Sequence, residues 1–110
     1  DGSAMMTAQG LWTAAASNIP VVYVICNNGI YKVLKVNMNM YKELVLKGET
    51  PPSQFLGMDF KLPFDMAGMA NANGVFGRRI EDPEELAPAL RDAIDSGRPT
   101  LLDVVIDPAL

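Results

Sequence analysis

Three short apolar runs along the chain are bounded by turn residues and predict strands. Residues 20–26 (PVVYVIC) form a continuous, mainly β-branched run, which is typical of a strand buried on both faces of a parallel sheet. The turn-forming segment Asn27-Asn28-Gly29 ends this run. Residues 75–80 and 100–106 predict two more strands, and Asp107-Pro108 closes the second of them.

Helical patterns occupy most of the remaining chain. Residues 4–17 are rich in Ala, Met and Leu, which favour a helix, and Ser3 is expected to cap its N-terminus. Residues 31–47 predict a helix of mixed character, and residues 64–72 predict a short one. Residues 48–63 hold three prolines and two glycines and predict a surface loop.

Residues 82–96 give the clearest helix signal. Asp82 is a capping residue, and Pro83 suits the first turn because its missing N–H needs no partner there. The two glutamates that follow place negative charge at the positive end of the helix dipole. Gly97 is expected to end the helix.

The predicted order is helix, strand, helix, helix, strand, helix and strand. This alternation predicts an α/β fold, in which right-handed crossovers join the strands of a parallel sheet and helices flank it in a three-layer α/β/α arrangement. With 110 residues the chain can form at most one small domain. Because Asp1-Gly2-Ser3 are turn and cap residues with nothing before them, we expect residues 1–110 to be part of a longer protein and the sheet to be incomplete.

Composition narrows the classes of function. Hydrophobic residues make up 49% and charged residues 20% of the chain, as in a globular domain. The net charge of −4 argues against nucleic acid or an anionic membrane as a partner. No apolar run is long enough to cross a membrane, and the single cysteine, Cys26, cannot form an internal disulfide. These features predict a soluble cytoplasmic protein in which Cys26 is a small buried side chain.

The chain contains no histidine, which excludes Ser-His-Asp and Cys-His catalysis and His-ligated zinc within it. The remaining chemistry depends on carboxylates, amides, hydroxyls and the backbone. A helix of about 14 residues rises roughly 21 Å, and a strand of about 7 residues returns roughly 23 Å. Asp1 and Asn28 should therefore meet at the carboxyl edge of the sheet, where open α/β folds bind ligands.

The residue types at this edge suit a hard cation that is bound to phosphate. Asp1 offers a carboxylate oxygen, Asn28 offers an amide oxygen, and the turn at Gly29 can direct a backbone carbonyl inward. Gly2 lets the backbone approach a diphosphate closely, and Ser3 lies at the N-terminus of the predicted helix, which attracts anions. A phosphohydrolase would require a second nearby Asp or a Lys clamp, and neither occurs in register.

Asp1-Gly2-Ser3, followed by a helix, a strand and Asn27-Asn28-Gly29, resembles the Gly-Asp-Gly…Asn-Asn signature of thiamine-diphosphate enzymes without its first glycine. The tail, with Met58-Asp59-Phe60, Gly97-Arg98-Pro99 and TLLDVVID, resembles the acetolactate-synthase-like and benzoylformate-decarboxylase-like members. The resemblance covers essentially the whole chain. It implies that residues 1–110 are the carboxyl-terminal portion of the diphosphate- and Mg²⁺-binding domain.

The resemblance also implies roles for individual residues. The side chains of Asp1 and Asn28 and the carbonyl of Ile30 would bind Mg²⁺. Three residues would contact the diphosphate of the cofactor: Gly2, Ser3 and Tyr31. Two residues at the start of the next helix would line the substrate pocket: Val33 and Leu34.

The implied function is that of a 2-oxo-acid decarboxylase or carboligase. The stretch LWTAAASNIP favours the benzoylformate-decarboxylase branch, with an acetolactate-synthase-like carboligase or a truncated non-catalytic α/β module as alternatives. In this family the activating glutamate lies in a pyrimidine-binding domain, often of a neighbouring subunit. We therefore expect no catalytic residue in this chain, no turnover by it alone, and a homo-oligomeric parent protein.

Overall fold

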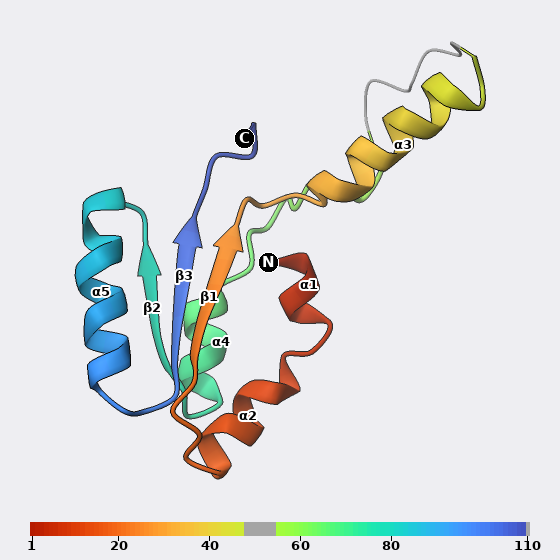
Figure 1. The fold of residues 1–110 in the computed structure, drawn as a ribbon. Coiled ribbons are helices and arrows are strands. Elements are labelled where there is room, and N and C mark those ends of the chain that lie inside the picture. Colours follow the sequence, from red (N-terminus) through yellow and green to blue (C-terminus); the bar gives the residue numbers. More distant parts are fainter. Residues whose placement is uncertain (48–54, 110) are drawn as a thin grey trace.

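The computed structural model describes residues 1–47 and 55–109. Three parallel strands form its sheet: β1 (Val22–Asn27), β2 (Phe76–Ile80) and β3 (Thr100–Val105), in the order β1-β3-β2 (Figure 1). All three carboxyl ends lie at one edge of the sheet, as parallel pairing requires. The predicted α/β class and the three predicted strands are confirmed.

Helices lie on both faces of this sheet, in three layers. One face carries α1 (Gly2–Met5), α2 (Gln9–Ala16) and α4 (Met66–Ala72), and the other carries α5 (Pro83–Asp95) (Figure 1). The remaining helix, α3 (Lys32–Leu44), projects beyond the carboxyl edge and contains no buried residue. None of the helices in the described ranges combines the length and the apolar character needed to cross a membrane.

Side chains alternate across the central strand and supply two cores. Leu101 belongs to the core under α2 and α4, together with Leu11 and Met66. Leu102 belongs to the core under α5, together with Ile80. β3 is therefore the strand that is buried on both faces, because successive side chains of a strand point to opposite sides.

β1 departs from the predicted double burial. It forms one edge of the sheet, and α5 packs on β2 and β3 rather than on β1. Val24 consequently retains 47% of its exposure. Cys26, expected to be buried, is exposed as well.

The helix predicted over residues 4–17 is two helices separated by a turn at residues 6–8. The backbone is wound more tightly at the end of α1 than in an α-helix. There the amides of Met6 and Thr7 donate to the carbonyls three residues back, each at 3.2 Å. Thr7, a weak helix former, lies at the break. The N-cap is Asp1 rather than Ser3: its Oδ1 accepts from the amide of Gly2 at 2.7 Å.

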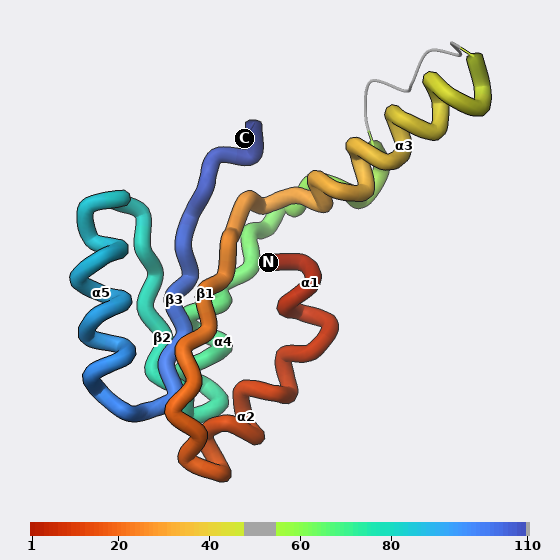
Figure 2. Tube along the Cα trace, viewed as in Figure 1, coloured from red at the N-terminus to blue at the C-terminus, as the bar shows by residue number. Residues whose placement is uncertain are grey.

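The later predictions agree more closely with the structure. Asp82 caps α5 by accepting from the amide of Glu84 at 2.9 Å, and Gly97 follows the helix with φ +61°. Of the predicted loop, residues 48–54 lie outside the described residues. Residues 55–63 return beside α3 toward the sheet without a regular helix or strand (Figure 2).

Replacing Gly77 by alanine tests the packing of α4 on β2. The added Cβ would lie 2.2 Å from the carbonyl oxygen of Ala67, so the helix must shift. We expect the free energy of unfolding to fall by about 1–3 kcal/mol, as for other overpacked interiors. Urea unfolding followed by circular dichroism measures this change.

Gly10→Ala is the matched control, because a Cβ there meets no atom within 4 Å. On α2 this change should be neutral or stabilising, by up to about 1 kcal/mol. Equal free energies of unfolding for the two variants would contradict the close approach of α4 to β2.

Candidate functional site at the carboxyl edge of the sheet

The carboxylate of Asp1 joins two segments that are far apart in the sequence. Its Oδ1 accepts from the amide of Gly2 at 2.7 Å, and its Oδ2 accepts from the amide of Gly29 at 2.8 Å. The backbone nitrogen of Asp1 also donates to the carbonyl of Cys26 at 3.4 Å. Asp1 is thus fixed beside the end of β1, as the chain lengths predict.

The turn after β1 directs polar groups to this edge. Gly29 adopts φ +68°, a left-handed conformation that glycine reaches without a steric penalty. Asn28 Oδ1 accepts from the amide of Ile30 at 3.2 Å, which fixes the orientation of its side chain. Among the described residues, the carbonyl of Ile30 accepts no hydrogen bond, so its oxygen is free for a ligand.

The segment after the loop braces the turn from its other side. The amide of Phe60 donates to the carbonyl of Gly29 at 2.9 Å, and the amide of Tyr31 donates to the carbonyl of Met58 at 2.8 Å. Ile30 and Asp59 form an isolated antiparallel bridge between these bonds. The turn is therefore held from three sides: by β1, by Asp1 and by residues 58–60.

Aromatic rings support the backbone at Gly2. Tyr31 contacts Phe60 edge to face at 4.7 Å between ring centroids, and Phe60 lies 4.6 Å from Phe64. Gly2 is buried against these rings, since a Cβ there would lie 2.3 Å from Tyr31 Cε1. A glycine is required here because the backbone and the Tyr31 ring occupy adjacent space.

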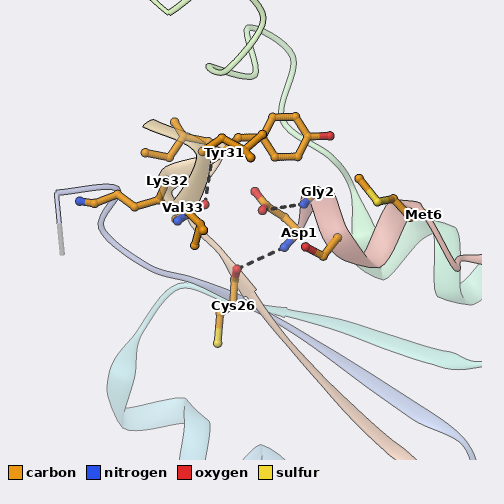
Figure 3. A pocket seen from close by; sticks show the side chains of 11 residues that line it. Asp1, Gly2, Met6, Cys26, Tyr31, Lys32 and Val33 are labelled. Carbon is orange, nitrogen blue, oxygen red and sulfur yellow. Dashed lines mark hydrogen bonds between the residues drawn. The ribbon is translucent and has the colours of Figure 1, made fainter. Parts of the chain in front are cut away.

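These groups line a cleft of about 390 Å³ (Figure 3). All eight residues predicted for metal, cofactor or substrate contacts border it: Asp1, Gly2, Ser3, Asn28, Ile30, Tyr31, Val33 and Leu34. Three further residues also border it: Met6, Cys26 and Lys32. Figure 3 shows the sulfur of Cys26 directed away from Asp1 and Gly2.

The donor set fits a hard cation that also binds phosphate. Carboxylate, amide and carbonyl oxygens come from Asp1, Asn28 and Ile30. The Asp1 carboxylate accepts two hydrogen bonds and retains lone pairs for a cation. Within residues 1–47 and 55–109, no three His, Cys, Asp or Glu side chains form a metal cluster. A cation bound here therefore needs further oxygens, such as those of a diphosphate.

Several supporting residues were not anticipated from the sequence. Phe60 contacts the Tyr31 ring and is itself backed by Phe64, and no local pattern signals this because residues 60–64 are not helical. Lys32 borders the cleft, but its ammonium donates to the carbonyl of Pro108 at 2.8 Å. Figure 3 shows this side chain directed away from Asp1. Lys35, one turn along α3, forms an ion pair with Asp59.

The sequence matches the family model described as "Thiamine pyrophosphate enzyme, C-terminal TPP binding domain" over residues 1–104. Thiamine pyrophosphate and thiamine diphosphate are the same compound. Because the match covers almost all of the chain, the chain belongs to this family of cofactor-binding domains. The resemblance read from the Asp-Gly and Asn-Asn motifs is thereby confirmed for the family.

Individual relatives include an acetolactate synthase subunit and a benzoylformate decarboxylase. The chain is 40% identical over 108 residues to a putative acetolactate synthase large subunit, IlvX, of Mycobacterium tuberculosis, covering 96% of this chain and 20% of that protein. It is 31% identical over 104 residues to benzoylformate decarboxylase of Pseudomonas aeruginosa, covering 94% and 18%.

Among solved structures, a thiamine diphosphate-dependent 4-hydroxybenzoylformate decarboxylase of Rhodococcus jostii RHA1 matches with a TM-score of 0.76 and 34% identity. The match covers 97% of this chain and 18% of that one. The fold of the chain is therefore that of a part of this thiamine diphosphate-dependent decarboxylase. The chain spans about a fifth of the length of the relatives it matches.

Gly2→Ala tests the close approach of the backbone to Tyr31. The new Cβ displaces the Tyr31 ring, which Phe60 prevents from moving freely, and so shifts Asp1 and Ser3. We expect thiamine diphosphate to bind the complete protein about tenfold more weakly, the equivalent of overpacking by ~1.4 kcal/mol. Isothermal titration calorimetry measures this. Gly10→Ala makes the same change away from the cleft and should leave binding unaltered; a similar loss in both variants would count against the role of Gly2.

Proposed function

We propose that residues 1–110 are the carboxyl-terminal portion of a diphosphate-binding domain and that the cleft binds thiamine diphosphate through Mg²⁺. Asp1, Asn28 and the carbonyl of Ile30 are the proposed metal ligands. The observation that carries the proposal is the Asp1 carboxylate, shared between the amides of Gly2 and Gly29 beside Asn28. This arrangement brings a single negative charge and two neutral oxygens to one point, which suits Mg²⁺ when phosphate oxygens supply the remaining ligands.

The proposed contacts to the diphosphate come from residues that adjoin the metal ligands along the chain and line the same cleft. Ser3 is exposed there, Gly2 keeps the backbone within reach, and Tyr31 closes the side against Phe60. These groups would hold the cofactor by its diphosphate. When bound, thiamine diphosphate supplies the ylid and the electron sink for decarboxylation, and the protein supplies orientation.

The proposed substrate wall consists of Val33 and Leu34. Both border the cleft at the start of α3 and retain 70% and 48% of their exposure. Apolar side chains there would bind the apolar substituent of a 2-oxo acid and exclude water from the reacting carbonyl. The parent activity we propose is decarboxylation of a 2-oxo acid by a benzoylformate-decarboxylase-like enzyme.

A carboligase is the second candidate. Identity to the acetolactate synthase relative is 40%, against 31% to the benzoylformate decarboxylase relative, which favours ligation of the decarboxylated intermediate to a second 2-oxo acid. Both candidates use the same cofactor site and differ in the acceptor.

We assign no catalytic role to any residue of this chain. We propose that a pyrimidine-binding domain, of the same or a neighbouring subunit in a homo-oligomer, completes the site. Supporting this, α3 presents apolar side chains without cover: Val36, Met40 and Leu44 retain 47%, 52% and 72% of their exposure. A large exposed apolar surface of this kind marks an interaction site.

Asp1→Ala tests the metal ligand. We expect thiamine diphosphate binding to the complete protein at saturating Mg²⁺ to weaken on the order of 100-fold, as for the loss of a strong charged interaction. Without Mg²⁺ the loss should be much smaller, because only the hydrogen bonds of Asp1 to Gly2 and Gly29 are then missing from the variant. Calorimetry with and without EDTA measures both. Asp95→Ala, an exposed carboxylate on α5, is the control. An equal loss with and without Mg²⁺ would exclude Asp1 as a metal ligand.

A substrate panel tests the reaction. The complete protein with thiamine diphosphate and Mg²⁺ should release CO₂ from aromatic 2-oxo acids, whereas residues 1–110 alone should show no turnover. If pyruvate yields acetolactate instead, the carboligase alternative holds. Turnover by the isolated 110 residues would contradict the proposed need for a second domain, and no cofactor binding by the complete protein would support a non-catalytic module.

A further inference from the structure

Asp103 is a carboxylate that the proposed site does not use. It lies on the central strand β3 and is completely buried, with 0% exposure. Isolating a carboxylate from water costs several kcal/mol, and a well-packed apolar residue at such a position is often neutral or stabilising for a fold. The partners of Asp103 therefore indicate what its carboxylate contributes.

These partners link the three strands at the carboxyl side of the sheet. Asp103 Oδ1 accepts from Asn27 Nδ2 on β1 at 2.9 Å, and Oδ2 accepts from an Arg79 Nη on β2 at 3.4 Å. Arg79 also donates to Glu81 at 2.8 Å, and this hydrogen bond raises the pKa of the Arg79 guanidinium. The Arg79 guanidinium that faces Asp103 is thus held in place by Glu81, which follows β2.

Asn27 connects this polar chain to the cleft. It is the last residue of β1, it is 5% exposed, and it directly precedes Asn28. Its side-chain amide has two hydrogens: one bonds to Asp103 and the other to the carbonyl of Phe64 at 3.3 Å. The backbone at the start of the Asn28-Gly29 turn is therefore fixed by a side chain that Asp103 holds.

Phe64 extends the same connection to the other wall. Its ring contacts Phe60, and Phe60 both contacts Tyr31 and donates its amide to the carbonyl of Gly29. The two hydrogen bonds of Asn27 thus hold β1 and residues 60–64 at a fixed separation. The orientation of the Asn27 side chain, which links these two segments, depends on its bond to the Asp103 carboxylate.

We propose that Asp103 is a positioning residue for the metal site: through Asn27 it fixes the turn that presents Asn28 and Ile30, and through Phe64 the wall that carries Tyr31. This inference rests on the proposed function. Asp103 does not touch the cation or the cofactor. Groups that orient metal ligands in this way typically contribute 10–100-fold to metal affinity.

Two substitutions in the complete protein separate this role from a general effect on stability. Asp103→Leu removes the acceptor while keeping the branching of the side chain at Cγ, and should raise the Mg²⁺ concentration for half-maximal thiamine diphosphate binding by about tenfold or more. Asp103→Asn keeps an oxygen facing Asn27 and should stay within about fivefold of the parent, since a neutral hydrogen bond is worth about 1 kcal/mol less than a charged one. Binding is titrated by calorimetry on protein whose circular dichroism matches the parent.

A reciprocal pair carries the test if Asp103→Leu does not fold. Asn27→Asp sets two carboxylates against each other, and adding Asp103→Asn restores one donor and one acceptor without changing volume. The double variant should recover part of the Mg²⁺ affinity that Asn27→Asp loses, because the bond between positions 27 and 103 is restored whereas the donor to the Phe64 carbonyl stays absent.

The outcomes distinguish failure of the proposed function from failure of the proposed role of Asp103. If the parent protein does not bind thiamine diphosphate with Mg²⁺, the proposed function fails and the role of Asp103 fails with it. If the parent binds but folded Asp103→Leu titrates like the parent, or the reciprocal pair shows no recovery, the role of Asp103 alone is wrong. A loss in Asp103→Leu with near-parental Asp103→Asn, or recovery in the reciprocal pair, supports it.

Discussion

Parallel pairing of β1 and β2 with the central strand β3 is the constraint on which the rest of the structure depends. It places three strand ends at one edge, and the polar residues that follow or precede these ends meet there. The Asp1 carboxylate then joins the segment before α1 to the turn after β1 through the amides of Gly2 and Gly29. Without the common direction of β1 and β3, Asp103 would not lie beside Asn27 at this edge of the sheet.

Much of this arrangement could be predicted from the sequence, because it depends on strand direction and on element length. The apolar runs at 20–26, 75–80 and 100–106 are local signals, and each corresponds to a strand in the structure. The meeting of Asp1 with the Asn28-Gly29 turn follows from the combined lengths of a helix and a strand. It holds although the helix is broken at residues 6–8, because the endpoints and not the path decide the contact.

Other features depend on contacts that no local pattern contains. The burial of Asp103 against Asn27 joins residues 76 positions apart, and only the register of β1 on β3 brings them together. The exposure of Val24 and Cys26 follows from the position of β1 at the sheet edge and from the placement of α5 over the other two strands. A β-branched run predicts a strand, but it does not reveal whether a helix covers that strand.

Our central proposal is that the carboxyl edge of this sheet holds a cation between Asp1 and the Asn28–Ile30 turn. A crystal structure of the complete protein with thiamine diphosphate and Mn²⁺ in place of Mg²⁺, using anomalous scattering to locate the metal, tests this claim most directly. We predict a metal within about 2.0–2.3 Å of an Asp1 carboxylate oxygen, Asn28 Oδ1 and the Ile30 carbonyl oxygen, in octahedral geometry. A metal bound to the diphosphate without Asp1 or Asn28 among its ligands would contradict the account.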